Sequence, residues 1–294
     1  MSLYLLPIAY TLFVWWFSTG VIIYLDSLPR RTYRWTMLGT TVVLAVALYG
    51  LAVSSGDTTV AGAYHGFTCG LLIWGWLEVS FLLGFVTGVR NAPCPPGCTG
   101  WRRFGLAIQA VLHHELAIIA GAVVVVDLTW GGANQVGTWT FMVLWGMRCS
   151  AKLNLFLGAP NLNAQFLPQH LRFLESYLLK KPMNLLFPLS ISVSSVVTVI
   201  LVQRAIAADA AAATGLTFLA ALMSLAILEH WFLVLPLPDA ALWKWALRDG
   251  APRRRIDAKV GTGRTLLRQV LAPASAPGGT AAAINDPGSA VPSP

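Results

Sequence analysis

Charged residues are scarce in this chain of 294 residues: Asp, Glu, Lys and Arg together make up 11% of it, against about 25% in an average soluble protein. A soluble domain of this length could not cover its surface with so few ions. Cysteine is also scarce, and four thiols are too few for a disulfide-stabilised scaffold. Hydrophobic residues, in contrast, account for 56% of the chain, and the mean hydropathy is +0.66. The composition therefore predicts an integral membrane protein.

Long apolar stretches recur along the chain. A helix needs about 20 apolar residues to cross the roughly 30 Å of hydrocarbon in a bilayer. Seven stretches meet this requirement, at about 3–25, 35–55, 60–87, 104–127, 136–157, 184–206 and 213–235. The first has no basic residue before it and is too long for a cleaved signal peptide, so we expect a permanent helix. The predicted fold is all-α, a polytopic membrane bundle with seven transmembrane helices over residues 1–238.

Basic residues are unevenly distributed between the two sides of this bundle. Every Lys and Arg except Arg204 falls in the first, third or fifth loop, in the adjoining half of the fifth span, or after the last span. Since basic loops stay in the cytoplasm, we expect a periplasmic N-terminus and a cytoplasmic C-terminus. The chain is therefore expected to cross the membrane several times, as a multi-pass protein.

Three segments outside the spans have a recognisable character. Residues 168–181 carry an apolar face made of Leu171, Leu174, Tyr177 and Leu178. This pattern predicts a short helix that lies in the membrane interface. Residues 239–270 form a basic juxtamembrane segment, and residues 271–294, rich in Ala, Pro, Gly and Ser, are predicted to be a disordered tail. The net charge is +8, but the sequence contains no recognisable nucleic-acid-binding motif. We therefore expect membrane lipid, and no nucleic acid, as a partner of the basic residues.

Ionisable residues inside the predicted spans are costly, and by default they indicate function. His65 lies near the periplasmic end of the third span. The others project to the middle or the cytoplasmic half of the bilayer: Glu78, His113, His114, Glu115, Arg148, Lys152, Glu229 and His230. We expect these residues to form one polar site facing the bundle interior.

Three interpretations of this site remain open. In the first, Arg148 and Lys152 lie on one face of a helix and balance the glutamates in an ion-pair network. In the second, an iron or zinc ion is bound by ligands drawn from Glu78, His113, His114, Glu115, Glu229 and His230. The spacing does not favour this metal site, because the Glu-x-x-His pairs of di-iron bundles are absent.

The third interpretation is a tetrapyrrole whose central metal is held by a single imidazole. A flat macrocycle can lie against a helix where a small residue precedes the ligand by one turn. Alanine stands four residues before each of three candidate ligands, His65, His114 and His230. Arg148 and Lys152 would then meet the carboxylates of the pigment. The cofactor that this interpretation predicts is a tetrapyrrole with a central Mg or iron.

Long segments of the chain also resemble a known family. The opening MSLYLLPIAYTLFVWWFSTGVIIYLDSLPRRTYRWTM, PCPPGCTGWRRFGLAIQAVLHHELAI, WGMRCSAKLNLFLGAPNLNAQFLP and LEHWFLVLPLPDAALWKWAL resemble the PuhE family of photosynthetic complex assembly proteins of purple bacteria. The similarity covers about residues 1–250. It implies a cytoplasmic or intracytoplasmic photosynthetic membrane, and reaction-centre or light-harvesting subunits or enzymes of bacteriochlorophyll synthesis as partners. It brings no catalytic residues with it.

These observations predict a non-catalytic membrane factor for the assembly of reaction-centre and light-harvesting complexes or for the modulation of bacteriochlorophyll synthesis. No phosphate-binding loop, nucleophile elbow or Ser/His/Asp arrangement is present in the sequence. The alternative is a membrane metalloenzyme that acts on a hydrophobic tetrapyrrole or a carotenoid-like substrate.

Overall fold

A computed structural model describes residues 2–162, 167–236, 242, 243, 245 and 246. The chain divides into two units, Met1–Asp249 and Gly250–Pro294, and all described residues belong to the first. This part of the chain is helical and contains no strand, which confirms the all-α class. The predicted tail at 271–294 and most of the predicted basic segment at 239–270 lie outside the described residues.

Seven α-helices and two 3-10 helices make up the described part of the chain. The α-helices coincide with the seven apolar stretches to within a few residues. Their bounds are α1 (Ser2–Asp26), α2 (Tyr33–Ser54), α3 (Val60–Leu82), α4 (Gly100–Thr129), α5 (Val136–Leu157), α6 (Leu186–Ala207) and α7 (Ala210–Val234). The 3-10 helices are η1 (Arg30–Thr32) and η3 (Gln169–Tyr177).

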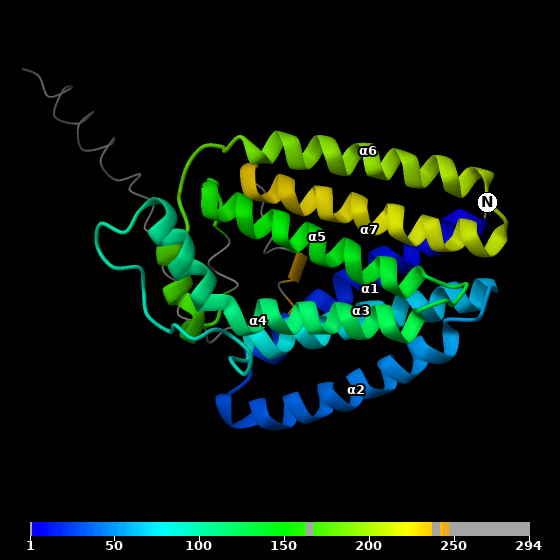
Figure 1. Cartoon of the computed structure of the whole chain (residues 1–294), viewed down its shortest axis with the longest axis horizontal. Helices are drawn as coiled ribbons and strands as arrows, with labels where there is room; N and C mark the ends of the chain where they lie inside the picture. The colour runs from blue at the N-terminus through cyan, green and yellow to red at the C-terminus, as the bar shows by residue number, and fades with distance from the viewer. Residues whose placement is uncertain (1, 163–166, 237–241, 244, 247–294) are drawn as a thin grey trace, which may run out of the picture. The chain divides into compact units, whose positions relative to one another are not determined.

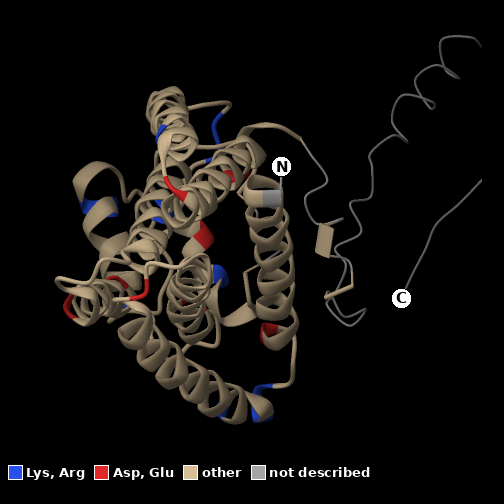
Figure 2. Ribbon diagram, turned by 90° about the vertical axis from the view of Figure 1, so that its right-hand side faces the viewer, with Lys and Arg blue, Asp and Glu red and all other residues tan. Residues whose placement is uncertain are grey.

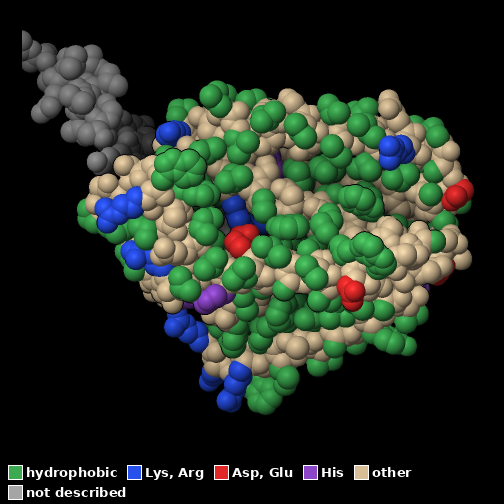
Figure 3. Space-filling view, viewed as in Figure 1, with side chains coloured by type: hydrophobic (Ala, Val, Ile, Leu, Met, Phe, Trp, Pro, Cys, Tyr) green, Lys and Arg blue, Asp and Glu red, His purple; other side chains and the backbone are tan. Residues whose placement is uncertain are grey.

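Consecutive helices run back and forth through the bundle (Figure 1). The α1–α2, α3–α4 and α5–α6 connections therefore lie at one end, which we call the basic end because it carries Arg30, Arg90 and Arg172. Figure 3 shows basic side chains gathered at this end, on the left of the view. Arg204, near the end of α6, lies at the opposite end.

Five of the helices are long and apolar enough to cross a membrane: α1, α2, α4, α6 and α7. The candidate span at α2 also includes η1. The other two, α3 and α5, fall outside this group. Both occupy the middle of the bundle, where α3 packs against α2, α5 and α7. The α5 helix in turn packs against α3 and α7, so both helices contact other helices on several sides.

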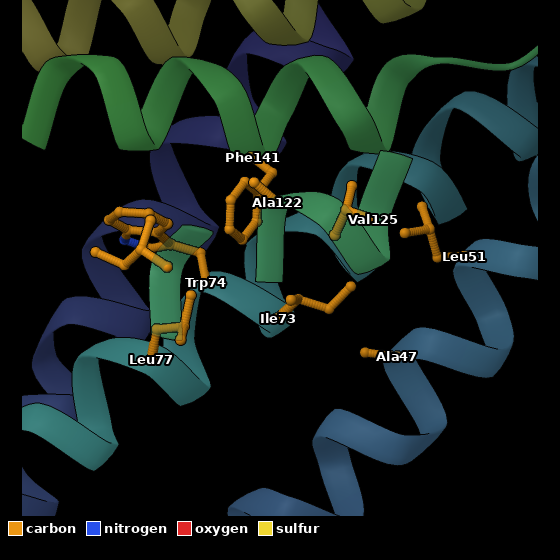
Figure 4. Close-up of a cluster of buried hydrophobic side chains, with 9 residues drawn as sticks. Ala47, Leu51, Ile73, Trp74, Leu77, Ala122, Val125 and Phe141 are labelled. Atoms are coloured by element: carbon orange, nitrogen blue, oxygen red, sulfur yellow. The ribbon is translucent and has the colours of Figure 1, made fainter. Parts of the chain in front are cut away.

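The hydrophobic core joins four helices around α3. Trp74 and Leu77 of α3 meet Ile118 and Val125 of α4, and the ring of Phe141 on α5 lies edge-on to Trp74 with centroids 5.5 Å apart. Figure 4 shows these side chains converging with those of Ala47 and Leu51 from α2. Close van der Waals packing of these side chains holds α2 to α5 together, because lipid tails are as apolar as the side chains and removal from water cannot drive the contact.

Glycine allows α3 and α5 to approach backbone to backbone. A Cβ atom at Gly70 would lie 2.5 Å from the carbonyl oxygen of Gly137, and one at Gly137 would lie 2.7 Å from the carbonyl oxygen of Gly66. Gly66 and Gly70 form a Gly-x-x-x-Gly pair, a spacing typical of close helix crossings in membranes. The helix crossing leaves no room for a side chain at Gly70 or at Gly137.

The helix predicted at 168–181 is present as η3, but its apolar face is covered by protein. Leu171 and Tyr177 are each only 2% exposed. The hydroxyl of Tyr177 donates to the carbonyl of Ala92 at 2.6 Å and accepts from Nε of Arg90 at 2.7 Å. These bonds attach η3 to the α3–α4 loop, so its apolar face packs on the protein instead of lying open to lipid.

Candidate functional site

An ion pair links α3 and α5 within the bundle. Nη2 of Arg148 lies 2.9 Å from Oε2 of Glu78. The Glu78 side chain is 11% exposed and that of Arg148 is 41% exposed. The carboxylate is therefore held inside, while the guanidinium reaches the surface of the bundle.

A second ion pair links α5 to α4. Nζ of Lys152 lies 2.7 Å from Oε1 of Glu115, and the two side chains are 28% and 23% exposed. Lys152 follows Arg148 by four residues, so both cations lie on one face of α5, as the ion-pair interpretation requires. Figure 2 shows acidic and basic positions on neighbouring helices inside the bundle, and Figure 3 shows an acidic and a basic side chain together in a recess of one face.

Among the residues that the structure describes, Glu229 of α7 is held by a tryptophan and not by a cation. Its Oε1 accepts a hydrogen bond of 2.7 Å from the indole of Trp15 on α1. Arg148 and Glu78 lie within electrostatic range of the Glu229 carboxylate. The indole of Trp15 also meets Trp243 edge-on, with ring centroids 5.5 Å apart. Glu229 thus extends the polar region from α5 to α1 and α7.

His114 is enclosed and has no polar partner. Its exposure is 0%, and neither ring nitrogen makes a hydrogen bond. The ring lies 4.5 Å from that of Phe81, and the charges of Lys152, Arg148 and Glu115 act on it. An imidazole in this state has two unused nitrogens beside the ion pairs. A ligand could reach it only if Phe81 or a neighbouring helix moved.

His230 is enclosed but fully bonded. Its Nδ1 is 2.8 Å from the carbonyl of Ala226 and its Nε2 is 2.9 Å from Oγ of Ser150. Because a carbonyl can only accept, Nδ1 carries the proton in this bond. Oγ of Ser150 also lies 2.9 Å from Oγ of Ser190 on α6, which accepts a hydrogen bond from the amide of Asn154. These contacts form a polar chain from α7 through α5 to α6.

Two predicted site residues lie apart from this region. His65 is exposed in the second turn of α3, at the end of the bundle opposite the basic end. His113 is exposed on α4 and points away from the enclosed His114. Within the described ranges, no three His, Cys, Asp or Glu side chains are grouped so that they could hold a metal ion. The structure instead pairs the predicted carboxylate ligands with cations and with a tryptophan.

Several polar contacts at the site were absent from the sequence-based prediction. Trp15 has no special pattern around it, and a tryptophan near a membrane edge is normally interfacial. Ser150 and Ser190 belong to spans in which serine bonds easily within its own helix. Only the four-residue spacing of Arg148 and Lys152 on α5 indicated that one face of this helix is polar.

Comparison with known proteins gives a family but no activity. A family model described as "Protein of unknown function (DUF3623)" matches residues 1–254. An uncharacterized 30.4 kDa protein in the puhA 5' region of Rhodobacter capsulatus is 41% identical over 242 residues, which cover 81% of this chain and 88% of the relative. No solved structure matches the chain at a significant level.

Proposed function

We propose that this chain, which belongs to the DUF3623 family, supports the formation of photosynthetic complexes in a bacterial membrane. It shares 41% of its aligned residues with a protein named for the puhA 5' region. The location in the relative's name suggests a neighbourhood of photosynthesis genes. The resemblance to the PuhE family points in the same direction. The proposed role is non-catalytic: assembly of reaction-centre and light-harvesting complexes or modulation of bacteriochlorophyll supply.

The membrane placement is the first part of the proposal. All seven α-helices span the inner or intracytoplasmic membrane, with the N-terminus in the periplasm and the C-terminus in the cytoplasm. The gathering of Arg30, Arg90 and Arg172 at one end supports this orientation through the positive-inside rule. Residues 1–238 then form the membrane domain, followed by a basic juxtamembrane segment and a tail.

The observation that carries the functional proposal is the partial exposure of charges inside the bundle. Arg148 and Lys152 are paired, yet their side chains remain 41% and 28% exposed. A charged side chain at the bilayer centre costs about 3 kcal/mol on insertion scales. Lipid tails cannot solvate these cations, so a polar partner at the α4–α5 face would stabilise them. A pigment carboxylate or a polar helix of a photosynthetic subunit provides such a partner.

The tetrapyrrole proposal adds a ligand to this face. His114 has unpartnered nitrogens, and the partly exposed side chains of Arg148 and Lys152 lie nearby. In this arrangement Arg148 and Lys152 would hold the carboxylates of a bacteriochlorophyll precursor, and His114 would hold its metal. His230 is a weaker candidate, since Ser150 and Ala226 already occupy both of its ring nitrogens.

Deletion of the gene and complementation test the role. We expect the deletion strain to lose near-infrared absorption of reaction-centre and antenna complexes, and the intact gene to restore it. His114→Ala should fail to restore it, while His113→Ala, a change at the exposed neighbouring position, should succeed. Immunoblots check that each variant accumulates in the membrane.

The outcomes separate the two parts of the proposal. Full complex levels in the deletion strain would reject the assembly role. Restoration by His114→Ala would reject ligation by His114 while leaving the assembly role in place.

A further inference from the structure

A cleft opens at the basic end, away from the ion pairs on α5. It has a volume of about 530 Å³, within the range of small-molecule sites. Arg30, Arg31 and Arg34 line one wall, and residues 83–85, which follow α3, line the other. A smaller hollow of about 230 Å³ shares Arg30 and Gly84 with it and extends the cleft to His170 of η3.

The three arginines bring unused positive charge to the cleft. Among the residues that the structure describes, ion pairs form only at Arg148 and Lys152, so none of the three guanidinium groups has a carboxylate partner. Arg34 lies over the ring of Trp35 at 5.3 Å, which orients it without neutralising it. Guanidinium groups present forked donors that match the oxygens of a phosphate group.

His170 adds a polar atom on the opposite wall. Its Nε2 is buried and has no hydrogen-bond partner. A Cβ atom at Gly84 would lie 3.0 Å from this nitrogen, and Gly84 adopts a positive φ of 84°. Glycine at this position therefore lets the imidazole edge reach the cleft wall.

An apolar track leads from the cleft along α2. Leu38, Val42 and Val46 follow Arg34 at intervals of four residues, so they continue its face of the helix, and each is at least 57% exposed. On the other side of the cleft, Phe85 is 54% exposed. A molecule with an anionic head and a long apolar chain matches this combination of cations and apolar surface.

From this geometry we infer that the cleft between the α1–α2 turn, the end of α3 and η3 binds the phosphate head group of an anionic phospholipid. The guanidinium groups of Arg30 and Arg34 hold the phosphate oxygens, and an acyl chain follows the exposed face of α2. The bound lipid would attach η3 to the α1–α2 turn. This inference uses the proposed position of the basic end at the membrane surface, and it is independent of the assembly role and of His114.

Binding of phosphatidylglycerol to the purified full-length protein in a neutral detergent tests the inference. We expect saturable binding of a fluorescent phosphatidylglycerol, with phosphatidylcholine a poor competitor. R30Q/R34Q should weaken binding about tenfold or more, because two charge-assisted contacts are lost. The matched control R172Q/K180Q removes two cations from the same end but outside the cleft, and it should change affinity less than about twofold.

A conservative variant separates a binding defect from misfolding. R30K/R34K keeps both charges and loses only the forked geometry, so its affinity should fall between those of the native protein and R30Q/R34Q. Size-exclusion profiles and helix content should be unchanged in all variants.

Three results would overturn the lipid assignment. Equal weakening in R172Q/K180Q would reduce the effect to general surface charge. Displacement of the lipid by millimolar inorganic phosphate would indicate a soluble phosphate compound as the occupant. Displacement by an acidic peptide such as polyglutamate would indicate a protein partner instead.

Discussion

Gly70 of α3 and Gly137 of α5 are in backbone contact, and this crossing sets the distance at which α5 runs along α3. A Cβ atom at Gly70 would lie 2.5 Å from the carbonyl oxygen of Gly137. Farther along the same two helices, Arg148 reaches Glu78 at 2.9 Å. The small residues thus determine the spacing that the charged residues require.

Replacement of Gly70 by alanine should therefore destabilise the bundle. The new methyl group overlaps the backbone of α5, and overpacking of this kind costs about 1–3 kcal/mol. We expect a lower Tm in detergent for Gly70→Ala. Gly75→Ala is the matched control on the same helix, because nothing lies within 4 Å of a Cβ atom there. Equal Tm values for the two variants would contradict the close crossing.

The Glu78–Arg148 pair should show coupling in a double-mutant cycle. Glu78→Gln leaves the guanidinium without its counter-ion, and Arg148→Gln leaves a largely buried carboxylate alone. Each change should cost about 1–3 kcal/mol of unfolding free energy, less than for a fully buried pair because Arg148 is 41% exposed. The double variant should be more stable than the sum of the two single changes predicts.

Reversible unfolding in mixed micelles measures this coupling. Arg204→Gln, at the opposite end of the bundle, serves as the control and should have little effect. Strict additivity of the two single changes would show that the pair contributes nothing.

Loss of the Tyr177 hydroxyl should loosen the α3–α4 loop. Tyr177→Phe leaves the carbonyl of Ala92 and Nε of Arg90 without their partner, which costs about 1–3 kcal/mol where the groups are buried. We expect faster limited proteolysis between α3 and α4. Tyr49→Phe, at a side chain that is 74% exposed, should leave the cleavage rate unchanged. A resistant loop in Tyr177→Phe would show that other contacts attach η3.

The pKa of His170 should respond to Arg30. Burial of the ring, and then the positive charge of Arg30, lower the pKa of His170 below its ordinary value of 6.5. His170 is therefore neutral at pH 7, and its imidazole gains a proton only when the pH falls below 6.5. Removal of the cation in Arg30→Gln should raise the pKa of His170 toward the ordinary value.

Nitrogen NMR of histidine-labelled protein follows this titration, with His170→Gln to assign the signal. The variant Arg204→Gln should leave the midpoint in place. A native midpoint at or above 6.5 would contradict the burial of the ring.

The helices could be predicted from the sequence because hydrocarbon thickness fixes the length of an apolar helix. The partners of the charged residues could not be predicted in this way. Arg148 and Lys152 were predicted to share one face of α5, which follows from helical periodicity alone. Their separate partners, Glu78 on α3 and Glu115 on α4, depend on how three helices pack.

Other differences arise where local pattern and tertiary packing compete. The apolar face of 168–181 has the spacing of an interfacial helix, but the hydroxyl of Tyr177 finds partners in the α3–α4 loop and the face packs on protein. His65 shares the small-residue spacing of His114, yet one is exposed and the other enclosed. A sequence pattern places a residue on a helix face and leaves open what that face meets.

The most direct test of the central proposal is the composition of this protein after isolation from phototrophically grown cells of its native host. Absorption spectra and mass spectrometry should show a bound tetrapyrrole or copurified reaction-centre or light-harvesting subunits. R148Q/K152Q should lose that material while retaining its helix content, and Arg204→Gln should keep it. Native protein free of both pigment and photosynthetic subunits, or the same content in R148Q/K152Q, would contradict the proposal that the charged face of α5 receives a photosynthetic partner.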